Sequence, residues 1–174
     1  MAVNYLEQLV AEWYEFQGYF VRRNIRVGPR PNGGYNCELD VVAFNPQEGK
    51  LVHIEPSMDA HTWAVREQRF ANKFLAGRTH IPALFAGVTL PETIEQIALL
   101  GYASTQNHTT VGGGRIMLVP ELLVEILRKL RDLPILSGAV HEQFPILRTL
   151  QFVSEHRNPI RQVLFPELRA NGPA

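Results

Sequence analysis

Two short apolar runs joined by a turn constrain the fold of this chain more than any other feature. Residues 38–44 and 51–57 are rich in β-branched and aromatic residues, and the Asn-Pro-Gln-Glu-Gly-Lys segment between them is typical of a hairpin turn. With the turn at Pro46–Gly49, counting back along the ladder places Asp40 directly opposite Glu55. The sequence therefore predicts an antiparallel hairpin that aims two carboxylates at each other.

The facing carboxylates need something to relieve their repulsion. Directly opposed side chains on a sheet have Cβ atoms about 4.5 to 5.5 Å apart, and like charges at that distance are destabilising. A hard divalent cation held by carboxylate oxygens would supply the missing positive charge. The alternative is an edge hairpin whose acids, Asp40 and Glu55, both point into water. The spacing alone leaves both interpretations open.

Length and charge set limits on the class of protein. The chain has 174 residues, about the size of one domain. Its 17 basic and 17 acidic residues cancel, and 45% of its residues are hydrophobic, which is typical of a soluble globular protein. A balanced charge argues against strong indiscriminate binding to nucleic acid, because that affinity comes mainly from neutralising phosphates. A local basic patch remains compatible with this composition.

Cysteine usage and hydropathy favour a cytoplasmic location. The single cysteine, Cys37, cannot form an internal disulfide, which suits a reducing compartment. No apolar run reaches the roughly 18 residues of a membrane span. Glu7 and Glu12 stand where a signal peptide would be basic and then apolar. We therefore expect no membrane partner.

Hydrophobic periodicity predicts an α/β fold. In the first half we expect a helix at 5–17, a strand at 19–27, the hairpin, a helix from about residue 62 to Leu75 ended by Gly77, and a strand at 81–88. Beyond it we expect a helix at 91–100, strands at 102–105 and 115–119, and helices at 120–133 and 143–156. The three glycines at 112–114 predict a turn rather than a phosphate loop, because no Lys-Ser/Thr pair follows them. We expect one domain over residues 1–158 and an extended tail over residues 159–174.

Three acidic positions carry a resemblance to a known family. Glu7 lies eleven positions before Gly18, Asp40 lies in a Leu-Asp-Val-Val strand, and a Glu55-Pro56-Ser57 segment begins fifteen residues after Asp40. With this spacing the chain resembles the PD-(D/E)xK nuclease superfamily, and within it most closely the archaeal-type Holliday junction resolvases. The resemblance covers roughly residues 3 to 90. It implies a restriction-endonuclease-like core of helix, three-strand antiparallel meander, helix and strand, followed by further α/β elements.

The resemblance implies a metal-dependent nuclease acting on DNA. Asp40 and Glu55 would bind Mg²⁺ or Mn²⁺, the backbone carbonyl of Pro56 would be a further ligand, and Glu7 would be a supporting acid from the first helix. Such a site activates water and neutralises charge on a phosphodiester. A catalytically inactive nuclease-fold module that binds nucleic acid or a protein partner is the alternative, and hydrolysis of another phosphate ester is a third. Assembly as a homodimer is left open.

Ser57 departs from the family pattern, which has a lysine at this position. The lysine role could have moved to another element, serine could suffice beside the metal, or the chain could be inactive. The next helix offers a replacement, because Arg66, Arg69 and Lys73 form one basic ridge at helical spacing and Lys73 is the only lysine in it. The alternative for that ridge is a solvated helix face.

Several further residues are candidates for binding. Arg22, Arg23 and Arg26 belong to the densest basic stretch and, with Arg66 and Arg69, could contact phosphates. The alternative for this stretch is a solvated strand edge and loop. His53 shares the carboxylate face and would be a ligand, a proton shuttle or a histidine packed under a helix.

Overall fold

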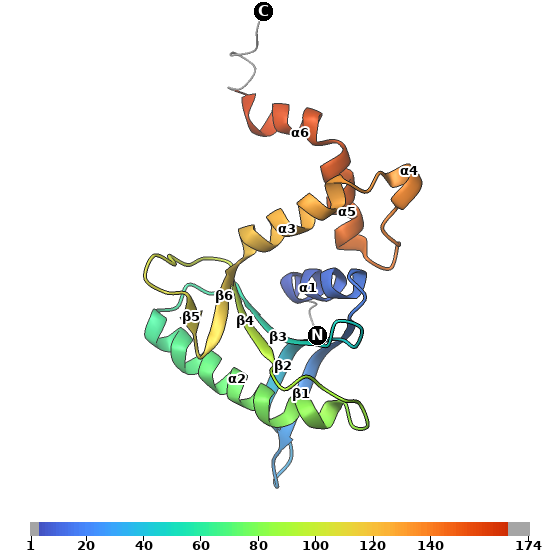
Figure 1. The fold of residues 1–174 in the computed structure, drawn as a ribbon. Coiled ribbons are helices and arrows are strands. Elements are labelled where there is room, and N and C mark those ends of the chain that lie inside the picture. Colours follow the sequence, from blue (N-terminus) through green and yellow to red (C-terminus); the bar gives the residue numbers. More distant parts are fainter. Residues whose placement is uncertain (1–3, 167–174) are drawn as a thin grey trace, which may run out of the picture. The chain divides into compact units, whose positions relative to one another are not determined.

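The computed structural model describes residues 4–166 and has an α/β fold, as predicted (Figure 1). Its elements are α1 (Tyr5–Phe16), β1 (Phe20–Pro29), β2 (Tyr35–Asn45), β3 (Lys50–Ser57), α2 (Trp63–Leu84), β4 (Glu95–Leu100), β5 (Thr110–Val111), β6 (Gly114–Leu118), α3 (Val119–Arg131), α4 (Ile135–Gly138), α5 (Pro145–Glu155) and α6 (Arg157–Leu164). None of the helices in this range combines the length and apolar character needed to cross a bilayer.

The strands form one mixed sheet in the order β1-β2-β3-β4-β6-β5. β1, β2 and β3 are an antiparallel meander, whereas β4 lies parallel to β3 and β6 parallel to β4. The opening order is helix, three antiparallel strands, helix and strand, but the strand after α2 is β4 and not the expected segment at 81–88. Figure 1 shows this sheet lying between α1 and α2.

The hairpin register is the predicted one. Asn45 pairs with Lys50 across the turn, and Val42 pairs with His53. Beyond the pairing of Val41 with Ile54, the backbone N–H of Asp40 donates to the Glu55 carboxylate at 3.1 Å instead of to a backbone carbonyl. The two strands thus stop pairing through their backbones at the position where the two acids meet.

The α1 helix begins and packs as its sequence predicts. The Asn4 side chain accepts a hydrogen bond from the Leu6 N–H at 3.1 Å and caps the first turn. Leu9, Val10 and Trp13 are buried on the face that contacts the sheet. Glu7, in the first turn of the same helix, is half-buried.

The α2 helix is longer than predicted and removes one expected strand. Gly77 does not end it, because the helix runs 22 residues to Leu84. A Cβ at Gly77 would lie 2.3 Å from Nδ1 of His53, so this glycine allows close packing of helix on strand. The apolar run at 81–88 was wrongly predicted as a strand; Ile81 is fully buried in the last turns of the helix. A short buried helical face and a buried strand share the same apolar pattern.

Two predictions in the following segment are also wrong. Residues 95–100, expected as part of a helix, are strand β4, which lies between β3 and β6 and is buried except at its first residue. Residues 102–105 form no strand. The predicted strand at 115–119 corresponds to β6, and Gly112 and Gly113 form the turn before it with positive φ. Burial on both faces gave β4 a continuous apolar pattern that resembles a buried helix.

The chain divides into two compact units, one ending at Leu122 and one beginning at Leu123. The second unit contains most of α3 together with α4, α5 and α6. The expected domain boundary at residue 158 falls inside α6, and the expected extended tail is helical through Leu164. Residues 167–174 of the expected tail lie outside the described residues.

Candidate active site where the β2–β3 hairpin ends

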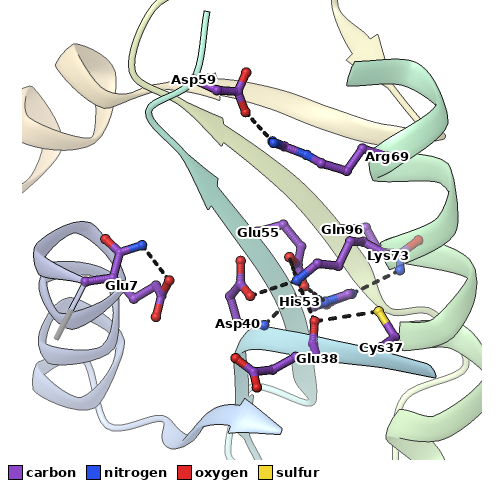
Figure 2. A network of polar contacts seen from close by, with 11 residues as sticks. Glu7, Cys37, Glu38, Asp40, His53, Glu55, Asp59, Arg69, Lys73 and Gln96 are labelled. Carbon is purple, nitrogen blue, oxygen red and sulfur yellow. Dashed lines mark hydrogen bonds and ion pairs between the residues drawn. The ribbon is translucent and has the colours of Figure 1, made fainter. Parts of the chain in front are cut away.

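The predicted carboxylate pair is present at the end of the hairpin (Figure 2). Glu55 is buried, with 2% of its side chain exposed, whereas 17% of the Asp40 side chain is exposed. The N–H of Asp40 donates to Oε1 of Glu55 at 3.1 Å, which fixes the two residues side by side. The alternative in which both acids point into water is therefore wrong for Glu55. One acid is buried and the other is partly exposed.

Lys73 lies between the two carboxylates. Its Nζ is 2.8 Å from Oδ1 of Asp40 and 2.7 Å from Oε2 of Glu55, and it donates to the backbone carbonyl of Glu38 at 2.5 Å. These three acceptors match the three N–H donors of an ammonium group. Lys73 belongs to the basic ridge of α2, and its contacts with the strands show that it does not lie on a solvated helix face.

The site holds more negative charge than one lysine balances. Burial, the Glu55 charge and a hydrogen bond with Glu55 raise the pKa of Asp40 to about 7, against the opposing effect of Lys73. Although burial alone would lower the pKa of Lys73, its ion pairs with Glu55 and Asp40 raise it. When both acids are ionised, this group of three carries one net negative charge. Deprotonation of Asp40 would therefore leave a negative charge that a bound cation could balance.

His53 is a neutral histidine held under α2. Its Nε2 lies 2.8 Å from Oε1 of Glu55, and its Nδ1 lies 3.3 Å from the amide nitrogen of Gln96. The Gln96 amide nitrogen donates both to Nδ1 of His53 and to the Phe74 carbonyl, so Nδ1 is an acceptor. We therefore assign the ring proton to Nε2, which donates to Glu55. Burial first, and then the charge of Lys73, lowers the pKa of His53 to about 3. Of the three interpretations, the histidine packed under a helix fits these contacts.

Glu7 approaches the site from α1. Figure 2 shows it projecting toward the strand that carries Asp40, and its hydrogen bond is with Asn4 at 2.5 Å. Burial and the negative charge of Asp40 raise the pKa of Glu7, which indicates that the two acids affect each other through space. Its part as a supporting acid stays a prediction, as does that of the Pro56 carbonyl.

Ser57 belongs to a second, neighbouring cluster. Its hydroxyl donates to Asp59, which also pairs with Arg69 and, at 3.3 Å, with Arg66. Burial would raise the pKa of Asp59, but the hydrogen bonds from Ser57 and the His61 N–H, together with Arg69, hold it well below its usual range. The serine is therefore engaged with Asp59 rather than with the carboxylate pair.

The two arginines of the basic ridge differ in access to solvent. Arg66 is buried and donates to the backbone carbonyls of Asp59 at 2.6 Å and Tyr102 at 2.7 Å. Arg69 has 39% of its side chain exposed. Of the two, Arg69 alone presents a guanidinium that a phosphate can reach.

The arginines of β1 are exposed but lie on a different element from the ridge. Arg22 donates to the Leu84 carbonyl at 3.2 Å, and Arg26 pairs with Glu38 at 3.4 Å. Arg23 is exposed beside them. Their contact with nucleic acid stays a prediction.

Sequence reasoning missed two residues that organise the site. Asp59 was not among the predicted site residues, yet it binds both Ser57 and Arg69. Gln96 was assigned to a helix, and its position on β4 beside His53 depends on a parallel pairing of distant segments. A polar residue inside a buried apolar run was the signal for Gln96, because buried polar groups need partners.

Comparison with protein-family models and with curated proteins finds no match to this chain. Within residues 4–166, no group of three or more His, Cys, Asp or Glu side chains is arranged to hold a metal. A cation beside Asp40 and Glu55 would therefore take its other ligands from water, backbone carbonyls or a substrate phosphate, which is the usual coordination of Mg²⁺.

Proposed function

We propose that this chain is a Mg²⁺- or Mn²⁺-dependent nuclease with a restriction-endonuclease-like core, and that its substrate is DNA. The observation that carries the proposal is the convergence of Asp40, Glu55 and Lys73 from three elements on one partly open position. The order of helix, antiparallel meander, helix and parallel strand supports it.

The donor set fits a divalent metal. Asp40 and Glu55 offer carboxylate oxygens, and burial followed by the charge of Glu55 raises the pKa of Asp40 despite the neighbouring Lys73. When bound, the metal would lower the pKa of a coordinated water and neutralise charge on the phosphodiester. Asp40 and Glu55 would hold it, and Glu7 would add negative charge from α1.

The protein's own side chains divide the remaining work. The ammonium of Lys73, beside Asp40, would stabilise a pentavalent phosphate and position the attacking water. In the family this role belongs to a lysine at the position that Ser57 occupies in this chain. His53 orients Glu55 through its Nε2–H, and Gln96 fixes the ring that does so. Arg69, which is partly exposed and pairs with Asp59, would be the cation of the ridge that meets a neighbouring phosphate.

Cleavage assays on the full chain test this proposal. Wild type is expected to cut supercoiled, single-stranded or branched DNA with Mn²⁺, and both Asp40→Asn and Lys73→Ala are expected to lose activity by about 10² to 10³ or more, because each removes a preorganised charge. Ser57→Ala is the matched control and should retain most activity, because Ser57 contacts Asp59 instead of the carboxylates. Cleavage that survives Asp40→Asn would contradict the proposal.

The alternative is an inactive nuclease-fold module that binds nucleic acid or a protein partner. All three donors of Lys73 are already engaged within the protein, which favours a static ion-pair network. In that case wild type is inert on every DNA substrate, while Arg69 still contributes to DNA binding. The same assay, combined with a binding measurement, separates the two functions.

A further inference from the structure

The second unit carries a groove between two helices. One wall is a face of α3 with residues spaced i, i+3, i+4 and i+7, namely Val124, Leu127, Arg128 and Arg131. The other wall has the same spacing on α6, namely Arg157, Ile160, Arg161 and Leu164. The groove has a volume of about 410 Å³. Two amphipathic faces thus border one space.

Apolar side chains from three helices line the groove. Val153 from α5 lies in it, and Phe165 borders it beyond α6. Val124, Leu164 and Phe165 are 45%, 64% and 49% exposed, respectively. Contiguous exposed apolar residues with a polar rim mark interaction surfaces.

The charge of the groove has one sign. Four arginines line it, and no acidic residue among those described does so. Arg157 donates to the Ser154 carbonyl at 3.2 Å, and Arg131 pairs with Asp132 at 3.2 Å. Arg128 and Arg161 are exposed, one on each wall. These two arginines therefore line the groove from opposite walls.

We propose that this groove binds an amphipathic helix of a partner protein, with an apolar face flanked by Asp or Glu residues. An apolar helix face lying in a hydrophobic groove is a recurring mode of peptide recognition. Acidic side chains on both flanks would meet Arg128 and Arg161, since exposed carboxylates and guanidiniums form bidentate pairs.

Other occupants fit the groove less well. A nucleic-acid backbone would pair its phosphates with the arginines but would leave the valine and leucine side chains without apolar partners. A second copy of this chain would have to offer its own acidic helix, α1, whose apolar residues Leu9, Val10 and Trp13 are already buried against the sheet.

The test is binding of a designed helical peptide to the full chain, measured by fluorescence anisotropy. The probe has leucines on one face and glutamates on both flanks, and a second probe replaces each glutamate by lysine. Only the acidic probe is expected to bind, with an affinity that falls as salt rises. The double variant Arg128→Glu, Arg161→Glu should weaken it by about tenfold or more, equivalent to about 1.4 kcal/mol.

Lys129→Glu is the matched control, because Lys129 is exposed on the same helix but does not line the groove. This variant should bind the acidic probe as wild type does. Leu164→Ser tests the apolar wall separately and should also weaken binding.

Four results would overturn the proposal. The first two are that the acidic probe shows no saturable binding, or that the lysine probe binds equally well. The third is that Lys129→Glu loses as much affinity as the double variant. The fourth is that the double variant loses binding to duplex DNA or to a second copy of this chain instead. Circular dichroism of each variant verifies that helix content is unchanged.

Discussion

Asp40 is the residue at which the two strands of the hairpin stop pairing and the polar contacts begin. Its backbone N–H bonds to the Glu55 carboxylate and its own carboxylate bonds to Lys73. Burial and a like charge raise its pKa, so the folded protein holds a proton there more tightly than the unfolded chain does. This single position connects the fold, the charge of the site and the response to pH.

The stability of the metal-free protein should therefore depend on pH through Asp40. Its pKa rises from 3.8 to about 7 on folding, so its contribution to stability falls as pH rises from about 4 to about 7. The effect is at most a few kcal/mol, because one pKa unit corresponds to about 1.4 kcal/mol. Asp40→Asn should lose this decline, as measured by urea unfolding at pH 5 and pH 8 with a chelator present.

The comparison with Asp40→Asn is needed because His53 acts in the opposite sense. Its pKa falls from 6.5 to about 3 on folding, so its contribution to stability rises with pH across that window. The two effects partly cancel in wild type. Identical pH slopes in wild type and Asp40→Asn would show that Asp40 does not titrate as described.

Arg66 and Arg69 should separate structure from DNA contact. Arg66→Gln is expected to destabilise the fold by about 3 kcal/mol, because it breaks a buried charge network. Arg69→Gln should lower the stability by less than about 1 kcal/mol, since the Arg69 side chain is partly exposed.

The Arg69→Gln change should instead weaken DNA binding. The slope of log binding constant against log salt concentration should fall by about 0.9. Unchanged binding in Arg69→Gln would remove Arg69 from the interface.

At the scale of elements, α2 brings the distant parts of the site together. It supplies Lys73 to the carboxylate pair and Arg69 to Asp59, and Gly77 lets it lie close against His53. The turn between β5 and β6 lies against the same helix: the N–H of Gly112 donates to Glu67 at 2.9 Å. Packing against the sheet and this turn fixes the helix that carries the lysine.

Two neighbouring glycines give a matched test of that contact. Gly112 and Gly113 both have positive φ, but a Cβ at Gly112 would lie 2.3 Å from the Ala71 nitrogen, whereas one at Gly113 would meet nothing within 4 Å. Gly113→Ala should cost about 1 to 2 kcal/mol, the cost of a left-handed conformation for alanine. Gly112→Ala should cost about 1 to 3 kcal/mol more, because backbone must shift. Thermal unfolding of both variants measures the difference, and equal costs would exclude a packing role for Gly112.

At the scale of the whole molecule, the chain is electrically neutral, with 17 acidic and 17 basic residues. Its charges are nevertheless segregated: acids meet at the end of the hairpin, and arginines line the groove of the second unit. A ligand approaching either unit would therefore meet a local charge that the net charge does not describe.

Metal binding should stabilise the whole fold by mass action. Millimolar Mn²⁺ or Mg²⁺ is expected to raise the melting temperature of wild type. At a metal concentration of one hundred times Kd, the free energy of unfolding should increase by about 2.7 kcal/mol. Asp40→Asn should abolish the shift, whereas Ser57→Ala should retain it. Absence of any metal-dependent shift in wild type would contradict a metal site at Asp40 and Glu55.

Local sequence patterns predicted the first three strands and the carboxylate pair. A hairpin turn of fixed length sets its register, so the position of Asp40 beside Glu55 followed from counting residues. The amphipathic stripe of α1 likewise follows from the spacing of Leu9, Val10 and Trp13. These features depend on neighbours in the chain, which is why the sequence by itself determined them.

Tertiary structure decided the rest of the site. Gly77 appeared to end a helix, but contact with His53 explains why a glycine is required inside it. The segment at 95–100 became strand β4 because it pairs with β3, and only that pairing brings Gln96 to His53. The cation beside the acids is Lys73, and its position there depends on how α2 packs across the sheet. Long-range packing overrides local propensity at these positions, so the sequence could name Lys73 as a candidate but could not place it beside the acids.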